Sequence, residues 1–500
     1  MRLADLLRGI PGSRIPDGAG QLVVRAVESD SRSIAAGDVF VAVRGEDVDG
    51  RTHAADAVAR GAIAVVADAP VDVPVPVVRV EDARTALAVL AAEAVGRPAD
   101  GLRLVGITGT VGKTSVLLML EGILREAGIP AGTVGSLGIR YAGSRDTTPN
   151  TTPGALELQR ALADMVHAGT DVVAMEVTSH ALSQGRVHGL MYDLGVFTNL
   201  TMLEHLEYHG SFRAYAGAKR RFLQHLEEDA PLVYAAGDRA VAQFARLHPG
   251  PRVGCGGGAA AVTVRREPIR LDGTRITLGL RRPLPRGPAP PLPPITMPIT
   301  LRAVGRPNIT NATLAAVAGL CLGADPESVR AAMERFEPAP RRLQVIHRDG
   351  PVIIDDTVGH PDSITGVFEV AARVPHQHLR VVFAIRGQRG PTINERDAEA
   401  LVIWSRRVPM DELAVTSAVD SADERNAVDP AERDAFLRVL DGAGVPYSHH
   451  DRLEDAVASA VGGAGRRDLV LLLGAQGMDA GAAIAGSVLA GGGARSAPPR

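Results

Sequence analysis

The chain has 500 residues, of which 45% are hydrophobic and 22% charged, and its formal net charge is −3 at pH 7. This length allows about three domains of ~150 residues each. The near-neutral charge gives no electrostatic case for binding nucleic acid. No run approaches the ~18 apolar residues of a membrane-spanning helix, so we expect no membrane insertion.

Two further features suggest the compartment. The two cysteines, Cys255 and Cys321, lie far apart and fit no metal-binding spacing, so we expect both to be buried apolar residues of a protein in a reducing compartment. The first residues lead into no apolar core of signal-peptide length. We therefore expect a cytoplasmic protein. We also expect it to be a monomer.

Residues 1–97 predict a small α/β domain, with strands at 39–43 and 63–66 and a helix at about 53–60. Ser31 and Arg32 precede the first of these strands. They form either a turn with a solvated arginine, or a hydroxyl and a guanidinium offered to a nucleotide or phosphate. Residues 96–101 predict a linker to the next domain, 98–338.

The stretch 104–115 carries the strongest functional signal. An apolar, β-branched run leads into the turn Thr108-Gly109-Thr110-Val111-Gly112, and Lys113-Thr114-Ser115 precedes a predicted helix over 116–127. Glycines let backbone N–H groups approach an anion, a helix N-terminus adds positive potential, and lysine supplies an ammonium. Thr114 or Ser115 can offer a hydroxyl to Mg²⁺. Strand, loop and helix together predict a nucleotide site, although Ile107 stands where the usual loop has its first glycine.

Polar residues follow two later strands of the same predicted sheet. The strand 171–177 carries Glu176 near its carboxyl end, beside the phosphate loop in a doubly wound sheet, where it either binds Mg²⁺ or is an exposed strand-end carboxylate. The strand 195–199 is followed by His205 and His209, a candidate corner for a hard cation.

Other polar groups have ordinary explanations when taken alone. Lys219 lies in a predicted helix over 215–228, where its spacing indicates a basic surface face. The segment 147–153 reads as a loop before a helix at about 155–168. Asn308 and Asn311 are expected to cap a helix at about 312–322, and the proline-rich segment 283–298 is expected to form an extended loop.

Residues 339–500 predict a third domain that alternates strands and helices, which implies a parallel sheet with crossover helices. Its expected strands are 352–354, 381–385, 413–416 and 469–473, and its expected helices are about 362–374, 395–406, 429–442 and 453–461. The tail after Leu489 is expected to be disordered. The fold class is thus α/β: three domains with mostly parallel or mixed sheets flanked by helices, the central one of the P-loop ATPase type.

In combination these motifs resemble the Mur ligase family, most closely its UDP-N-acetylmuramoyl-tripeptide synthetases, over nearly the whole chain. The residues at 30–32, 37–40, 49–50 and 61–62 are similar to the uridine-nucleotide domain. The rest of the resemblance lies in Thr108-Gly109-Thr110-Val111-Gly112-Lys113-Thr114, Glu176-Val177-Thr178-Ser179-His180-Ala181-Leu182 with Arg186-Val187, Thr198-Asn199-Leu200-Thr201 with 205–210, and Tyr215 with Ala218-Lys219.

The resemblance implies an ATP- and Mg²⁺-dependent enzyme that joins the carboxylate of a UDP-muramoyl-peptide-like substrate to an amino acid through an acyl phosphate. It implies catalytic roles for Lys113, Lys219 and His205, with a CO₂-derived carbamate on Lys219. It implies Mg²⁺ ligands at Thr114, Glu176, His205 and Lys219, and ATP contacts at Gly109, Thr110, Gly112, Lys113, Thr114, Ser115, Asn311, Arg342 and Asp356. It implies acceptor-substrate contacts at Ser31, Arg32, Thr151, Thr152, Ser179 and Arg186.

The sequence departs from the family pattern mainly in the third domain. Val111 replaces the loop asparagine, and residues 202–204 are one residue longer than the family's R-D. The D-Y-A-H-x-P signature reads Asp356-Thr357-Val358-Gly359-His360-Pro361, G-K-G-H-E becomes 474–479, and D-N-P-R is absent from 417–425. We therefore expect the chemistry to be retained and the amine to differ from diaminopimelate.

Two alternatives remain open on the sequence. One is a related ligase of a specialised peptide pathway with no UDP sugar, and the other is a nucleotide-binding protein that has lost turnover.

Overall fold

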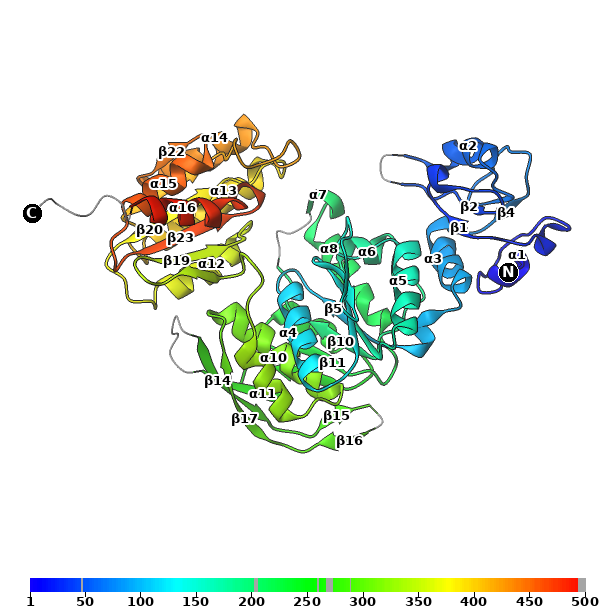
Figure 1. The fold of residues 1–500 in the computed structure, drawn as a ribbon, viewed down its shortest axis with the longest axis horizontal. Helices are drawn as coiled ribbons and strands as arrows, with labels where there is room; N and C mark the ends of the chain where they lie inside the picture. Colours follow the sequence, from blue (N-terminus) through cyan, green and yellow to red (C-terminus); the bar gives the residue numbers. More distant parts are fainter. Residues whose placement is uncertain (46–47, 202–205, 259, 267–272, 288, 493–500) are drawn as a thin grey trace, which may run out of the picture.

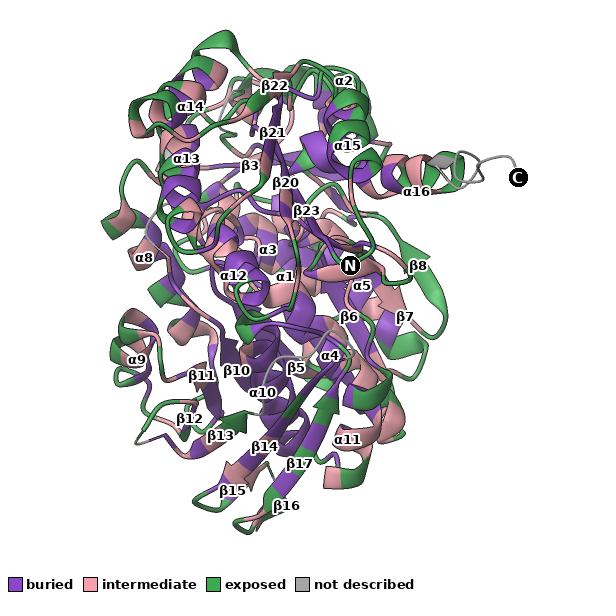
Figure 2. Cartoon of the chain, turned by 90° about the vertical axis from the view of Figure 1, so that its left-hand side faces the viewer, coloured by how far each residue is buried: buried purple, intermediate pink, exposed green. Residues whose placement is uncertain are grey.

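The computed structural model describes residues 1–45, 48–201, 206–258, 260–266, 273–287 and 289–492, which form three α/β units in chain order (Figure 1). The central unit lies between the other two. Strands and helix faces toward the sheets are buried while outer helix faces are exposed (Figure 2). The predicted α/β class is confirmed. Among the described residues, no helix combines the length and apolarity that crossing a bilayer requires.

The N-terminal unit is built on a four-stranded parallel sheet in the order β1-β2-β3-β4. Valines and alanines of the central strands are fully buried, as expected for a parallel sheet covered on both faces. Its elements are α1 (Leu3–Leu6), β1 (Val27–Glu28), β2 (Val39–Val41), α2 (Ala54–Ala59), β3 (Ala64–Ala67), β4 (Val77–Arg79) and α3 (Ala83–Ala94), with short 3₁₀ turns at Ala19–Gln21, Ser31–Ser33, Gly50–His53 and Pro98–Gly101.

The central unit contains an eleven-stranded sheet in the order β17-β14-β13-β12-β11-β10-β5-β9-β6-β7-β8, parallel from β13 to β6 and antiparallel beyond. Its strands are β5 (Arg103–Thr108), β6 (Ala131–Gly135), β7 (Gly138–Tyr141), β8 (Ser144–Asp146), β9 (Val172–Glu176), β10 (Leu194–Phe197), β11 (Leu232–Ala235), β12 (Arg252–Cys255), β13 (Val262–Arg266), β14 (Thr274–Leu280) and β17 (Thr296–Leu301). A separate hairpin pairs β15 (Leu284–Arg286) with β16 (Ala289–Leu292).

Helices cover this sheet and set the position of the loop at the end of β5. They are α4 (Lys113–Glu126), α5 (Ala155–His167), α6 (Ser179–Ser183), α7 (Leu206–His209), α8 (Phe212–Arg220), α9 (Arg239–Ala245), α10 (Arg306–Cys321) and α11 (Pro326–Arg335), with a 3₁₀ turn at Arg221–His225. α4 packs between the sheet and α10 and α11, and its apolar side chains belong to the largest hydrophobic core of the chain.

The C-terminal unit has a six-stranded sheet in the order β18-β19-β23-β20-β21-β22, parallel except for β18. Its elements are β18 (Gln344–His347), β19 (Val352–Asp356), α12 (Pro361–Ala371), β20 (Leu379–Ala384), α13 (Pro391–Ser405), β21 (Glu412–Thr416), α14 (Pro430–Ala443), β22 (Ser448–His450), α15 (Leu453–Gly462), β23 (Leu469–Gly474), a 3₁₀ turn (Gln476–Met478) and α16 (Gly481–Gly492). The predicted parallel sheet is confirmed, and β18 and β22 extend it at its edges.

The structure corrects four local predictions. The predicted helix 215–228 ends as an α-helix at Arg220 and tightens into a 3₁₀ turn that buries Phe222. α10 begins at Arg306 with Pro307 in its first turn, so Asn308 and Asn311 lie inside the helix rather than capping it. The proline-rich segment 283–298 holds β15, β16 and the start of β17 instead of one extended loop. α16 continues past Leu489 to Gly492, and the rest of the tail lies outside the described residues.

Both cysteines are buried and free, as expected, and burial raises the pKa of the Cys321 thiol to about 12.

Candidate functional site

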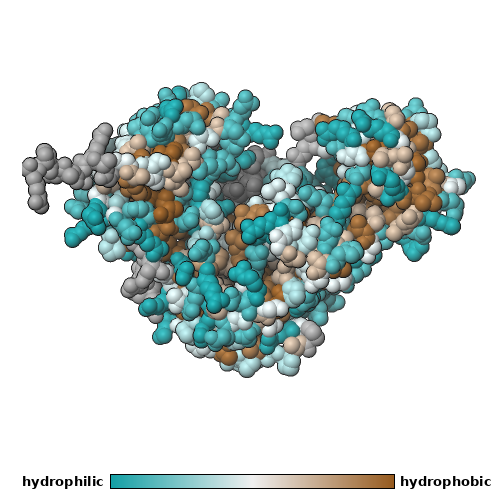
Figure 3. All heavy atoms as spheres, viewed as in Figure 1, coloured by the Kyte–Doolittle hydropathy of each residue, from teal (hydrophilic) through white to brown (hydrophobic). Residues whose placement is uncertain are grey.

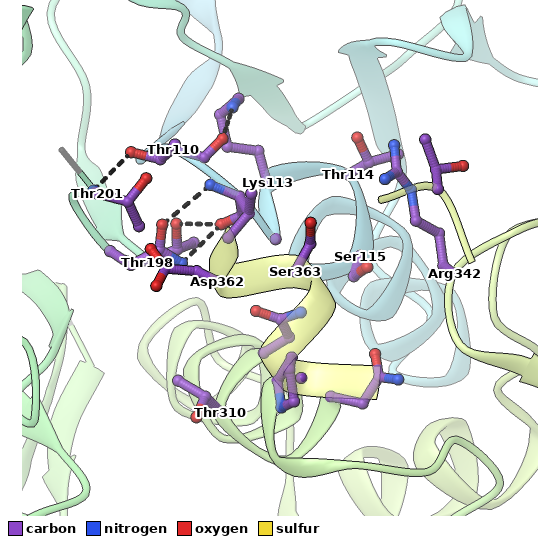
Figure 4. A pocket seen from close by; sticks show the side chains of 18 of the residues that line it. Thr110, Lys113, Thr114, Ser115, Thr198, Thr201, Thr310, Arg342, Asp362 and Ser363 are labelled. Carbon is purple, nitrogen blue, oxygen red and sulfur yellow. Dashed lines mark hydrogen bonds between the residues drawn. The ribbon is translucent and has the colours of Figure 1, made fainter. Parts of the chain in front are cut away.

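A cavity of about 1100 Å³ lies where the carboxyl ends of central-unit strands face the C-terminal unit. The loop after β5, the start of α4 and the start of α10 line it from the central unit, and Arg342, Asp362 and Ser363 line it from the C-terminal unit (Figure 4). The face of the molecule in Figure 3 is hollowed between the outer lobes, above the central unit. Two units thus contribute to one site.

The loop 109–112 holds its shape through glycine conformations and close packing. Gly109 (φ 140°) and Gly112 (φ 88°) lie in the region that other residues avoid. A Cβ at Gly109 would meet the Thr198 hydroxyl, and one at Gly112 would meet the Asn311 amide oxygen. These positions therefore need glycine. Between them, Thr110 N donates to Asn199 O at 3.0 Å, so this part of the loop is tied to the residue that follows β10.

Asn199 holds the backbone of Val111, the loop residue that differs from the pattern of the family that the sequence resembles. Its side-chain amide accepts a hydrogen bond from Val111 N and donates one to Val111 O, both at 2.9 Å, and the Thr198 hydroxyl donates to the same carbonyl at 2.7 Å. The Val111 side chain itself is 36% exposed. The loop conformation is therefore held through the backbone of residue 111 and not through its side chain.

The first turn of α4 carries the predicted phosphate and metal residues. The Lys113 ammonium donates to Gly109 O at 3.0 Å and to Thr110 O at 2.8 Å. The Thr114 hydroxyl donates to Glu176 Oε1 at 2.9 Å, and Ser136 N donates to the same oxygen at 2.9 Å. Glu176 is 1% exposed and ends β9, the strand beside β5, as the sequence predicted.

These donors fit Mg²⁺, a hard cation that is held by a few carboxylate or hydroxyl oxygens and keeps several waters. Thr114 and Glu176 provide a hydroxyl and a carboxylate at the edge of the cavity. No cluster of three or more His, Cys, Asp or Glu side chains with metal-binding geometry occurs within the described ranges. His205, the third predicted ligand, lies outside the described residues.

Lys219 is not on the surface face that its spacing indicates. It is 1% exposed, and its ammonium donates to Gly109 O at 2.9 Å and to Thr108 Oγ1 at 3.2 Å. It therefore lies beneath the phosphate loop rather than on the cavity wall. Tyr215, one turn earlier on α8, pairs its hydroxyl with Thr110 Oγ1 at 2.8 Å.

The predicted acceptor-substrate residues do not all lie at one site: some line the cavity and others do not. Thr151, Thr152 and Arg186 line the cavity, although the Thr152 hydroxyl is buried and donates to Glu176 O at 2.8 Å. Arg186 donates to Thr152 O at 2.7 Å and also lines a second cavity of about 360 Å³ toward the N-terminal unit. The Ser179 hydroxyl is buried, with no hydrogen-bond partner among the described residues.

Ser31 and Arg32 line neither of these cavities. Ser31 is buried, whereas the Arg32 side chain is 84% exposed and pairs with Asp30 at 2.7 Å. The hydrogen bond from Arg32 lowers the pKa of Asp30 to about 2. The arginine is thus an exposed cation of the N-terminal unit.

The C-terminal unit places Arg342 and Asp356 on the cavity opposite Asn311 of α10. Asp356 is buried at the end of β19, and its carboxyl accepts from Leu343 N at 2.5 Å. Burial raises the pKa of Asp356 to about 7, and burial raises the pKa of the adjacent Asp355 to about 6 against the lowering effect of Arg341.

Ser136, Asn199 and Arg386 are among the cavity residues that escaped prediction from the sequence. Ser136 follows β6, whose order beside β9 brings it to Glu176. Asn199 lay in a quoted motif, but its amide clamp on residue 111 depends on the pairing of β10 with β5. Arg386 follows β20, and nothing in the surrounding sequence distinguishes it from a surface arginine.

Three family models match the chain: "Mur ligase family, catalytic domain" over 23–95, "Mur ligase middle domain" over 107–319 and "Mur ligase, glutamate ligase domain" over 341–476. The chain is 35% identical over 482 residues to the UDP-N-acetylmuramoyl-L-alanyl-D-glutamate--2,6-diaminopimelate ligase of Geobacillus kaustophilus, covering 95% of this chain and 94% of the relative.

Solved structures share the fold along the chain. A structure of a ligase with the same name aligns with a TM-score of 0.68 at 21% identity, covering 96% of this chain and 97% of that one. The MurF ligase of Thermotoga maritima in complex with ADP aligns with a TM-score of 0.64 at 18% identity, covering 95% and 99%.

Proposed function

Since this chain belongs to the Mur ligase family of ATP-dependent, amide-forming ligases of peptidoglycan precursor synthesis, we propose that it joins an amino acid to the terminal carboxylate of a UDP-N-acetylmuramoyl peptide. The proposed intermediate is an acyl phosphate. The relatives' names specify diaminopimelate. Because the D-N-P-R signature is absent from this chain, we do not propose diaminopimelate as its amine substrate.

The observation that carries the proposal is the contact between Thr114 and Glu176. A hydroxyl at the first turn of α4 and a buried carboxylate at the end of β9 meet at 2.9 Å on the wall of a cavity that the C-terminal unit also lines. This geometry supports phosphoryl transfer from ATP at the loop 109–112. It also leaves room for the amine on the opposite side.

The chain's own residues account for the first step. A free carboxylate is a poor electrophile and is repelled by the γ-phosphate that it must attack. Lys113, the first residue of α4, reduces this repulsion, and the N–H groups at the start of the same helix hold the phosphate oxygens. Bound at Thr114 and Glu176, Mg²⁺ would neutralise further phosphate charge.

The remaining ATP contacts are proposed for Gly109, Thr110, Gly112, Ser115, Asn311, Arg342 and Asp356, and acceptor contacts for Ser31, Arg32, Thr151, Thr152, Ser179 and Arg186. His205 and Lys219 are proposed to complete the metal site, Lys219 as a carbamate formed with CO₂. We propose that a domain 1–97 binds the uridine end of the acceptor, a domain 98–338 binds ATP and a domain 339–500 binds the amine. We propose a monomeric, cytoplasmic enzyme.

Alanine substitutions at Lys113 and Glu176 test this proposal. With ATP, Mg²⁺, bicarbonate, a UDP-muramoyl dipeptide and amino acids, each variant should lose amide formation by at least about 10²-fold, because each removes charge stabilisation. Lys219→Arg, which cannot form the carbamate, should lose activity that added bicarbonate does not restore.

Exposed Arg438 of α14 provides the control, since R438A should keep wild-type turnover. Full activity in K113A or E176A would refute the proposed site. Wild-type activity in K219R would refute the carbamate alone.

A further inference from the structure

The segment between α11 and β18 holds two residues in a backbone conformation that side chains rarely adopt. Arg341 (φ 58°) and Leu343 (φ 50°) both lie in the left-handed region, and neither is glycine. Such residues persist only where surrounding contacts fix them, and they concentrate at functional sites. Arg342, the residue between them, lines the cavity (Figure 4). The turn 341–343 is therefore built around the residue that reaches the cavity.

The Arg341 side chain ties this turn to the ends of two strands. Its Nη2 donates to Gly474 O at the end of β23 and, at 3.0 Å, to Ala475 O. Its Nη1 pairs with Asp479, and its Nε donates to Asp355 Oδ1 on β19 at 3.4 Å. The side chain is 12% exposed, so these partners replace water around a buried charge. All three guanidinium nitrogens are thus bonded to the protein.

Backbone hydrogen bonds hold the turn on both sides of Arg342. Thr357 N donates to Arg341 O at 2.8 Å, and Leu343 N donates to Asp356 Oδ2 at 2.5 Å. The turn is therefore fixed to the C-terminal sheet, whereas α11 before it packs on the core of the central unit. Arg342 approaches the cavity from a support that belongs to the C-terminal unit alone.

The same guanidinium joins two segments of the cavity wall that are far apart in sequence. Ala475, which accepts from Arg341, lines the cavity, as does Arg342. The loop 474–479 is also where the G-K-G-H-E signature is replaced in this chain. A guanidinium binds phosphate well only when it is held in place by supporting contacts. The contacts of Arg341 provide this support for its neighbour.

We propose that Arg341 is a positioning residue for ATP binding, which fixes the turn 341–343 to the loop 474–479 and so holds Arg342 toward the nucleotide. This inference rests on the proposed function, which assigns Arg342 to ATP. Arg341 does not itself line the cavity, and its donors are occupied by protein groups. It acts through Arg342.

Glycine is the most informative substitution at position 341. R341G removes the guanidinium and keeps the left-handed backbone without strain, so it separates the side-chain contacts from the shape of the turn. Arg97 provides the matched control. It also lies in the left-handed region (φ 54°) and pairs with two carboxylates, Glu93 at 3.0 Å and Asp100 at 2.9 Å, but it lines neither cavity. R97G should keep the wild-type KM for ATP, and thermal unfolding checks that each variant is folded.

The first readout is the KM for ATP at saturating acceptor and amino acid. R341G should raise it about 10-fold or more, toward the value of R342A, because the hydrogen bonds that hold the turn are lost. R341K, which keeps the charge with fewer donors, should give an intermediate value. D479N should raise it by about threefold or less, since Asp479 is 62% exposed and the bonds to the carbonyl groups of Gly474 and Ala475 remain.

The double variant R341G/R342A shows whether Arg341 acts through its neighbour. It should have the KM for ATP of R342A alone, because no guanidinium is left to be misplaced. Two effects that multiply would overturn the proposal. So would a lowered unfolding temperature or kcat in R341G with a wild-type KM for ATP, which is the result of a merely structural role.

Calorimetric titration of the same variants with Mg²⁺ and the β,γ-imido analogue of ATP repeats the comparison without turnover. R341G and the double variant should both bind the analogue as weakly as R342A does, and R97G as tightly as the wild type. Wild-type affinity in R342A would refute its proposed ATP contact and this proposal with it. A wild type that binds the analogue but forms no amide would refute the ligase function, while the order of affinities would still decide the role of Arg341.

Discussion

At the scale of single residues, Asp355 and Asp356 at the end of β19 make the stability of the folded protein depend on pH. Burial raises the pKa of Asp356 to about 7 from its ordinary 3.8, and raises that of Asp355 to about 6. The folded state therefore binds these protons more tightly than the unfolded chain does. Their stabilising contribution is complete below about pH 4 and is lost as pH rises toward 7.

Asp356→Asn should remove much of this dependence, because an amide keeps an acceptor for Leu343 N and carries no charge. Between pH 5 and 7 the free energy of unfolding of the wild type should fall relative to D356N, by up to about 1.4 kcal/mol per pH unit. Denaturant unfolding followed by fluorescence of Trp404, the chain's one tryptophan, measures this in the same unit.

Asp434→Asn is the control, since Asp434 lies exposed on α14, and its curve should parallel that of the wild type. Parallel pH dependence in D356N and the wild type would show that Asp356 is not held neutral by burial.

The sequence predicted individual site residues best where the residues that act together are close in sequence or follow from the order of parallel strands. The cluster Lys113-Thr114-Ser115 was predictable because loop and helix start are contiguous, and Glu176 because carboxyl ends of parallel strands share an edge. Lys219 was predicted from spacing to lie on a basic surface and lies buried, because its environment depends on how α8 packs under the loop. Arg386 could not be predicted as a cavity residue, since it is held there by a bond to Gly359, 27 residues earlier.

At the scale of elements, the phosphate loop owes its shape to the neighbouring strand. Both backbone groups of Val111 are bonded to the Asn199 side chain, which follows β10. Because the Val111 side chain takes no part in these bonds, the replacement of the family's asparagine leaves the loop geometry intact.

Asn199→Ala should therefore raise the KM for ATP by about 10-fold or more, since two hydrogen bonds to the loop backbone are lost. Val111→Asn, in contrast, should leave it within about threefold. Steady-state kinetics with saturating acceptor and amine measures both. A larger effect of V111N than of N199A would mean that the side chain at 111, and not the clamp on its backbone, determines nucleotide binding.

Element types in the parallel regions followed from apolar runs separated by amphipathic helices, and the structure confirms them. The predicted ends of helices and strands were wrong where a turn or a proline has a role other than the expected one. Pro307 lies in the first turn of α10 instead of preceding the helix. The segment 283–298 was predicted to be an extended loop, yet Pro285 lies in β15 and Pro290 and Pro291 lie in β16, which form a two-stranded hairpin. Pro298 lies in β17, an edge strand of the central sheet, where a missing N–H costs least.

At the scale of the whole molecule, one cavity draws on two units, so the phosphate loop and the proposed amine side are carried by different sheets. The loop 109–112 and Glu176 belong to the central sheet, whereas Arg386 and Gln476 belong to the C-terminal sheet. The residues 417–425, which stand where D-N-P-R is absent, do not line the cavity within the described part of the chain. The main sheet of each unit was foreseeable from periodicity, but the cavity between the central and C-terminal units was not.

The central claim is tested most directly by mass spectrometry of one reaction. The wild-type enzyme is given ATP, Mg²⁺, bicarbonate and a UDP-muramoyl dipeptide with a panel of amino acids and diamines. We expect a new mass equal to acceptor plus one amino acid minus water, with ADP in equimolar amount. ADP release without any amide, or no turnover across the panel, would contradict the account.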